Sequence, residues 1–162
     1  MYKYFEPLTE SEVGELIQLS KEVKFTKAEG YRRRRGANAP QVNSVYNFSR
    51  WFDWHSSQRK QYKTYFPTTV REKIVQGWFL ELPPHIGFLD LMDYWVGKPQ
   101  SGRVIATALK DQSIWLDGKE QRLSAGEQIG FSLELLHEIK TCREGGLWAC
   151  VMFMGCYTKH ED

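Results

Sequence analysis

The sequence lacks several features that would place the chain in a membrane or an oxidising compartment. Its 162 residues include three cysteines, an odd number without the paired spacing of a metal site. We therefore expect reduced, mostly buried thiols at Cys142, Cys150 and Cys156, not a disulfide or a zinc site. No apolar run of about 18 residues could span a membrane, and the first residues lack the apolar core of a signal peptide. These absences predict a soluble, cytoplasmic protein.

A large excess of one charge is also absent. The chain has 22 Lys and Arg against 20 Asp and Glu, which gives a formal net charge of +2. By itself this balance implies no strong polyanionic partner. Internal repeats and linkers are missing too, and the length suits one domain with a full core. Aromatic residues, in contrast, are plentiful. Six Trp, nine Phe and eight Tyr suit a β-rich core or a stacking surface.

Two helices are predicted ahead of the strands. Thr9 and Glu12 form a capping box, in which each residue satisfies a free backbone N–H of the other. Apolar residues then recur at helical spacing, so residues 10–22 are predicted to form an amphipathic helix. A second capping box, Thr69 to Glu72, begins a helix that is expected to end at Gly77.

From His85 onward the hydrophobic pattern is that of strands. Asp117-Gly118 is a strong hairpin signal, because both central positions of a type I′ turn favour positive φ. Further turns are expected at 124–126 and 144–146. The predicted strands are 88–95, 103–109, 113–116, 120–123, 128–131, 138–141 and 147–157. Short strands with frequent turn signals indicate a barrel or sandwich.

These elements define the predicted fold class, a β-rich α+β fold. We expect one domain over residues 1–162. Its N-terminal part, residues 1–82, would be made of helices and loops, and residues 83–157 would supply the barrel strands.

Two stretches combine positive charge with aromatic residues. The first is a run of four arginines, Arg32, Arg33, Arg34 and Arg35. It could bind nucleic acid or phosphate, or it could be a strand whose arginines point to solvent and to an acidic group inside the fold. The second stretch, residues 47–66, interleaves aromatics such as Trp51 and Trp54 with basic residues. Such mixtures stack bases and neutralise phosphates, but aromatics can also fasten a long loop to a β-core. A protein or nucleic-acid partner bound through residues 32–66 is therefore one of two open interpretations.

The C-terminal half resembles a known barrel. Residues 126–140 read GEQIGFSLELLHEIK and are followed by Gly145-Gly146 and an apolar last strand. This pattern resembles the C-terminal half of a double-stranded β-helix, and is most similar to the 2-oxoglutarate/Fe(II)-dependent oxygenases of prolyl-hydroxylase type. Residues 116–127 also resemble part of a cupin, which shares the barrel. The resemblance implies a jelly-roll barrel preceded by two helices.

The resemblance also implies a metal centre of two His and one carboxylate, with open positions for the cosubstrate and oxygen. His137 corresponds to the distal metal-binding His. The His-x-Asp pair is incomplete, because Asp90 and Asp93 keep the carboxylate but lack the His two residues earlier. His85 lies nearby, although not at the family spacing. The candidate metal ligands are thus His137, Asp93, Asp90 and His85, and the implied cofactors are Fe(II) and 2-oxoglutarate.

In the family an Arg or Lys lies about ten residues past the distal His, with a Ser two residues further on. A bidentate Arg suits this task because it matches the geometry of a carboxylate. Leu147 and Ala149 stand at these positions. Arg103, Lys140 or Arg143 could hold the cosubstrate from elsewhere.

Two hypotheses follow. In the first, the scaffold has lost its metal and cosubstrate site and works as a binding or structural module, since a fold can outlive its chemistry. A cupin-like binder of sugars or other small molecules is a variant of this hypothesis. In the second, the chain is an active 2-oxoglutarate/Fe(II)-dependent hydroxylase with a non-standard metal set, acting on a protein or nucleic-acid substrate.

Overall fold

The computed structural model describes residues 2–27, 50–68, 74–82, 89–90, 102–116, 118–132, 139–141 and 144–154. The first elements are β1 (Tyr2–Tyr4), α1 (Glu10–Lys21), β2 (Thr26–Lys27), β3 (Arg50–Asp53), α4 (Ser56–Tyr62) and the short 3₁₀ helix η1 (Lys63–Tyr65). The remaining strands are β4 (Gln76–Leu82), β5 (Leu89–Asp90), β6 (Gly102–Ala108), β7 (Gln112–Leu116), β8 (Lys119–Leu123), β9 (Gln128–Ser132), β10 (Ile139–Thr141) and β11 (Gly146–Met154).

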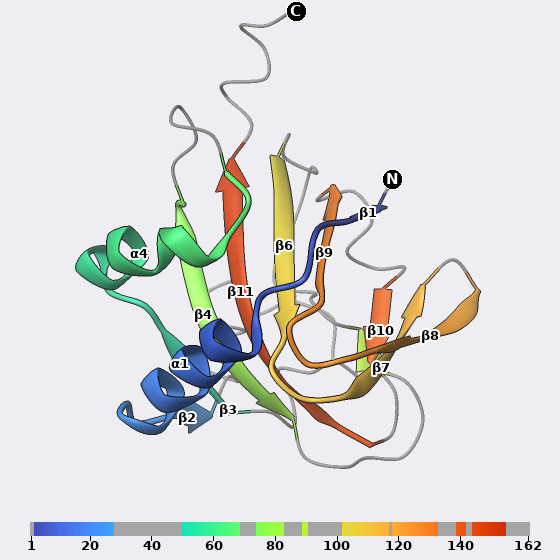
Figure 1. Cartoon of the computed structure of the whole chain (residues 1–162), viewed down its shortest axis with the longest axis horizontal. Helices are drawn as coiled ribbons and strands as arrows, with labels where there is room; N and C mark the ends of the chain where they lie inside the picture. The colour runs from blue at the N-terminus through green and yellow to red at the C-terminus, as the bar shows by residue number, and fades with distance from the viewer. Residues whose placement is uncertain are drawn as a thin grey trace, which may run out of the picture.

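The strands form two sheets (Figure 1). The large sheet has the order β1-β9-β6-β11-β4-β3-β2, and the small sheet has the order β5-β10-β7-β8. From β4 onward the chain passes repeatedly between the two sheets, so that strands distant in sequence become neighbours. The β-rich jelly-roll arrangement that the resemblance implies is therefore confirmed.

Alternation along the strands divides the core into two clusters. The interior cluster lies between the sheets, and its residues on β11 are Trp148, Cys150 and Met152. Its other members are Trp51, Trp78, Leu80, Leu82, Val104, Ala106, Ala108, Ile114, Leu116, Leu123, Ile129 and Phe131.

The helix-side cluster covers the opposite face of the large sheet. Its members are Leu16, Trp54, Tyr62, Phe66, Ile74, Phe79, Ile105, Leu109, Ala149, Val151 and Phe153. Helices α1 and α4 supply the covering residues, and Figure 1 shows both helices on this side of the sheet.

Helix α1 forms as the sequence predicts. Thr9 Oγ1 accepts a hydrogen bond from the Glu12 backbone N–H at 3.1 Å, and Glu12 Oε1 accepts one from the Thr9 N–H at 2.9 Å. The helix buries Val13 and Leu16 and ends at Lys21, with Glu22 as its C-cap. None of the described helices is long and apolar enough to cross a membrane.

The second predicted helix is wrong at its C-terminal end. Residues 69–73 lie outside the described part, but Ile74 and Val75 are not helical and Gln76 already begins β4. Gly77 does not end a helix. It lies within β4, where the Trp54 ring occupies the space that any side chain at position 77 would need. A helix that the sequence did not predict, α4, lies instead at Ser56–Tyr62. It is inside the stretch 47–66, for which the sequence left open a basic-aromatic surface or a loop.

The barrel begins earlier than residue 83. Strand β4 is hydrogen-bonded to β11 on one side and to β3 on the other, with Leu80 opposite both Trp148 and Trp51. The large sheet therefore includes residues 76–82. The predicted turns are in place, and Gly118 at φ 74° allows the tight β7–β8 hairpin.

Candidate functional site

Two of the segments that carry candidate metal ligands are attached to β5 and β10, which are neighbouring strands of the small sheet. Lys140 of β10 is opposite Asp90 of β5, and Thr141 is opposite Leu89. Because the strands are antiparallel, the chain leaves β5 at the same end of the small sheet at which it enters β10.

Asp93 follows the last described residue of β5, and His137 precedes the first residue of β10. Asp93, His137, His85 and Arg143 all lie outside the described residues. Within the described residues, no three His, Cys, Asp or Glu side chains are grouped so that they could hold a metal ion.

The two positions expected to grip the cosubstrate face away from the barrel interior. Leu147 and Ala149 pack with the helix-side cluster, whereas the alternate residues Trp148 and Cys150 face the interior and are fully buried. The whole strand is apolar, so the sequence alone could not show which set points inward. The inward positions of β11 are the even-numbered residues.

Arg103 is also on the helix side. Its guanidinium carbon lies 4.8 Å from the centre of the Phe153 ring, which belongs to the helix-side cluster. The next residue on β6, Val104, belongs to the interior cluster. Arg103 is thus on the opposite face of the sheet from the barrel interior. A cosubstrate held by Arg103 would therefore lie on the helix side of the sheet and not in the barrel interior.

No family model matches the sequence, and no curated protein matches it. Solved structures do. HygX from Streptomyces hygroscopicus, with nickel and 2-oxoglutarate bound, superposes with a TM-score of 0.55 at 9% identity over 94% of this chain and 82% of that chain. A prolyl hydroxylase from Trichoplax adhaerens, in complex with a hypoxia inducible factor oxygen degradation domain peptide fragment, gives a TM-score of 0.57 at 9% identity over the same shares. The chain has an oxygenase-like double-stranded β-helix fold. At this identity the likeness concerns the fold alone.

The described interior of this double-stranded β-helix does not fit a 2-oxoglutarate anion. On β4, β6, β9 and β11, none of the described inward-facing residues carries a positive charge. An anion buried among apolar side chains without a cationic partner loses its hydration and gains nothing comparable in return. The described inward positions of these four strands therefore offer no carboxylate clamp.

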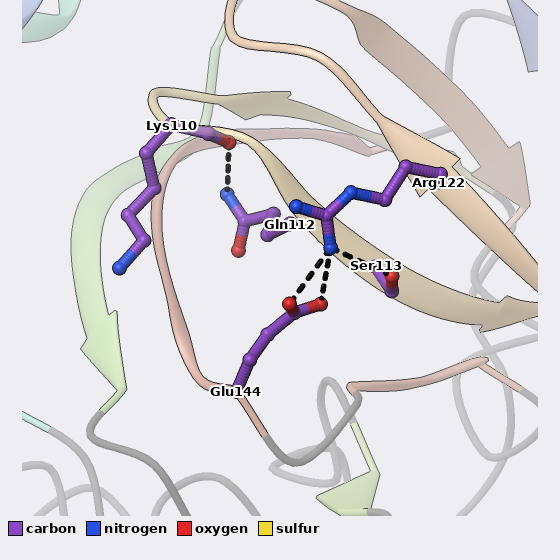
Figure 2. A network of polar contacts seen from close by, with 5 residues as sticks. All are labelled: Lys110, Gln112, Ser113, Arg122 and Glu144. Atoms are coloured by element: carbon purple, nitrogen blue, oxygen red, sulfur yellow. Dashed lines mark hydrogen bonds and ion pairs between the residues drawn. The ribbon is translucent and has the colours of Figure 1, made fainter.

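The Gln112 side chain packs against Gly146, the first residue of β11, a contact that no sequence pattern predicted. Its side chain is only 1% exposed, and its Nε2 donates to the backbone oxygens of Leu147 at 2.8 Å and Lys110 at 3.2 Å. A Cβ added at Gly146 would collide with the Gln112 amide. Figure 2 shows the Gln112 amide near the contacts among Arg122, Glu144 and Ser113. In the sequence, the Gly145-Gly146 pair at this contact predicts a turn and does not indicate the amide packed against it.

A second polar contact fastens the turn before β11 to the small sheet (Figure 2). Arg122 Nη1 donates to both carboxylate oxygens of Glu144, at 2.7 and 2.8 Å, and to Ser113 Oγ at 3.2 Å. The hydrogen bond from Arg122 lowers the pKa of Glu144 and is the main cause of that shift. The Arg122 and Glu144 side chains are 58% and 40% exposed. Solvent screens such a pair, so we assign it a structural role.

Cys150 is a buried thiol, as the sequence predicts for the cysteines. Burial raises the pKa of this thiol well above its ordinary value. A thiol held neutral in an apolar interior is a packing group and not a nucleophile. Cys142 and Cys156 lie outside the described residues.

Trp51 and Trp54, predicted as partner-binding residues, have buried rings with exposed fractions of 6% and 1%. Trp51 packs in the interior cluster, and Trp54 packs edge-on against Tyr62 and Phe79 with ring centres 5.0 and 5.2 Å apart. For these two residues the packing interpretation holds, since their faces are not open for stacking. The arginine run Arg32 to Arg35 lies outside the described residues, in the connection between β2 and β3.

Proposed function

We propose that this oxygenase-like β-helix is a binding or structural module that does not hold 2-oxoglutarate inside its barrel. The observation that carries the proposal is the orientation of β11. The inward positions Trp148, Cys150 and Met152 are apolar and fully buried, while Leu147 and Ala149 face the helices. Gln112 adds to this by occupying the space beside Gly146 at the start of the strand.

A titration of the purified protein with Mn(II) and 2-oxoglutarate, followed by calorimetry, tests the proposal. We expect no saturable binding of 2-oxoglutarate at millimolar concentration, with or without the metal. The matched variants are His137→Ala and His55→Ala, because His55 is an exposed residue at the start of α4. Micromolar binding of metal and 2-oxoglutarate that is lost in His137→Ala and kept in His55→Ala would contradict the proposal.

An active hydroxylase with a non-standard metal set is the second candidate. It is favoured by the antiparallel pairing of β5 with β10, which brings the chain ends leading to Asp93 and His137 to one end of the small sheet. In that reading Asp93, His137 and His85 would hold Fe(II), which when bound supplies the oxygen-activating chemistry. The matched pair Asp90→Asn and Asp93→Asn tests it by electron paramagnetic resonance of bound Mn(II). Loss of metal binding in Asp93→Asn alone supports the candidate, and equal binding in both variants excludes it.

The working surface of the module would be basic. We propose that the Arg32–Arg35 run binds a polyanionic partner, supported by exposed basic residues on the described neighbouring elements, such as Arg50 and Lys60. Binding of a labelled single-stranded oligonucleotide should weaken in an Arg33→Glu/Arg34→Glu variant, and the loss should shrink as salt increases. The variant Lys119→Glu, on β8 in the small sheet, serves as the control. Equal binding by all three proteins at low salt would contradict a role of the arginine run.

A further inference from the structure

The first strand, β1, forms one edge of the large sheet. Strand β1 is at the end of the large sheet and pairs with β9, with Tyr2 opposite Phe131 and Tyr4 opposite Ile129. Tyr2 packs against the interior cluster, whereas Phe5 packs with the helix-side cluster. In Figure 1, β8 and β9 run apart from the turn that joins them, and β1 follows β9 along this divergence. Strand β1 therefore lies at the edge of the large sheet that faces this divergence.

Tyr4 connects the two sheets across this opening. Its hydroxyl donates to Gln121 Oε1 at 3.2 Å, and Gln121 belongs to β8, the strand at the end of the small sheet. Tyr2 and Tyr4 meet edge-on, with ring centres 6.1 Å apart. The Tyr4 hydroxyl thus links the edge strand of the large sheet to the edge strand of the small sheet, and the Tyr2 ring packs against the Tyr4 ring.

The attachment of residues 2–8 is made mainly through the backbone. Beyond the strand, Phe5 N donates to Gln128 O at 3.0 Å and Leu8 N donates to Gly126 O at 2.9 Å. The Phe5 ring lies so close to Gly130 that an added Cβ there would be 2.7 Å from its Cε2. Little of the segment is buried, since Lys3, Glu6 and Pro7 are exposed and Tyr4 is 42% exposed. Segments with few buried contacts open at lower free energy than core strands.

We propose that residues 2–8 are a strap that detaches as a unit, opening the interior cluster to solvent and to apolar small molecules while the two sheets stay intact. The strap has one strand partner, a single described side-chain link to the small sheet and little buried area. Phe131 and Ile129 lie beside the strap, opposite Tyr2 and Tyr4 on β9, and belong to the apolar interior cluster. The opened side would therefore admit uncharged, hydrophobic molecules. This inference does not depend on whether the metal site is lost or active.

Hydrogen exchange of the full chain is the first test. We expect the backbone amides of the strap to exchange at least about tenfold faster than those of Val104 to Ala106 on β6, because local opening requires less free energy than global unfolding. A Tyr4→Phe variant keeps the ring but loses the bond to Gln121, and it should increase exchange in the strap alone. Exchange of the strap at the rate of β6 would overturn the proposal, because the strap would then open only when the protein unfolds.

Dye binding is the second test. In a Tyr2→Ser/Tyr4→Ser variant, we expect fluorescence of the apolar dye ANS to increase several-fold and acrylamide to quench the interior tryptophans more strongly. Far-UV circular dichroism should stay unchanged. Lys3→Ser is the matched control, since Lys3 is on the other face of the same strand, over the Phe5 ring. An unchanged dye signal would overturn the proposal. Loss of the β-sheet spectrum would overturn it as well, because β1 would then be part of the cooperatively folded core.

Discussion

The Gln112 amide occupies the space that any side chain at Gly146 would need. Gly146 is the first residue of β11, and Gln112 is the first residue of β7. The contact therefore connects the two sheets at one end of the barrel. It also replaces an inward-facing side chain of β11 with an amide from the opposite sheet.

Gly146→Ala should destabilise the protein by about 1–3 kcal/mol, because the added methyl overpacks a filled site. Gln112→Ala should cost a similar amount, about 1–3 kcal/mol, since the Leu147 carbonyl loses its donor. Urea unfolding measures both values. In the Gly146→Ala/Gln112→Ala double variant the added methyl has room. The stability lost by the double variant should therefore be smaller than the sum of the losses in the two single variants. Strict additivity would show that the residues do not compete for the same space.

Arg103→Leu should leave any metal or 2-oxoglutarate binding unchanged, because Arg103 lies over Phe153 on the helix side of the sheet. We expect only a modest loss of stability, on the order of 0.5–1 kcal/mol for a partly exposed cation–π contact. Calorimetric titration and urea unfolding of the variant separate the two effects. A selective loss of cosubstrate binding with unchanged stability would place Arg103 in the binding site instead.

Thr9→Ala should reduce the free energy of unfolding by about 1 kcal/mol, because the Glu12 N–H loses its cap. Thr9→Ser keeps a hydroxyl at the same position and should retain most of the stability. Thermal unfolding of the three proteins at one concentration compares them. Equal destabilisation by Ala and Ser would mean that the methyl group of Thr9, and not its hydroxyl, is what matters.

Tyr65 should make the protein lose stability in alkaline solution. Burial, followed by the 2.6 Å hydrogen bond to Glu15, raises the pKa of Tyr65 to about 12 from its ordinary value of 10.0. A raised pKa contributes stability that is complete below pH 10.0 and is lost as the pH rises toward about 12. Tyr65→Phe should therefore show a shallower decline of urea stability in this window. An identical decline in the variant would assign the alkaline loss to other groups.

The sequence predicted the β-rich barrel because its local signals agree with one another. Three predicted features occur where expected: the capping box at Thr9, the hairpin at Gly118 and the strand that ends at Leu123. These features depend on neighbouring residues, and local chemistry determines them.

The facing of β11 could not be predicted, because an unbroken apolar strand between two buried layers has no polar side to mark its orientation. Leu147 and Trp148 are equally apolar, yet they belong to different clusters. Helix α4 was missed for a related reason. Its seven residues, SSQRKQY, bury only Tyr62, and packing against Trp54 stabilises the helix more than its own pattern does.

The pairing of β2 with β3 has a consequence for how this chain can vary. Lys27 is directly opposite Arg50, so the connection between them, residues 28–49, leaves the sheet and returns to it at adjacent points. The cost of closing such a connection increases only slowly with its length, by about 0.6 kcal/mol for each doubling. The paired residues Lys27 and Arg50 fix both ends of this connection, so its length can vary at little cost in closing free energy.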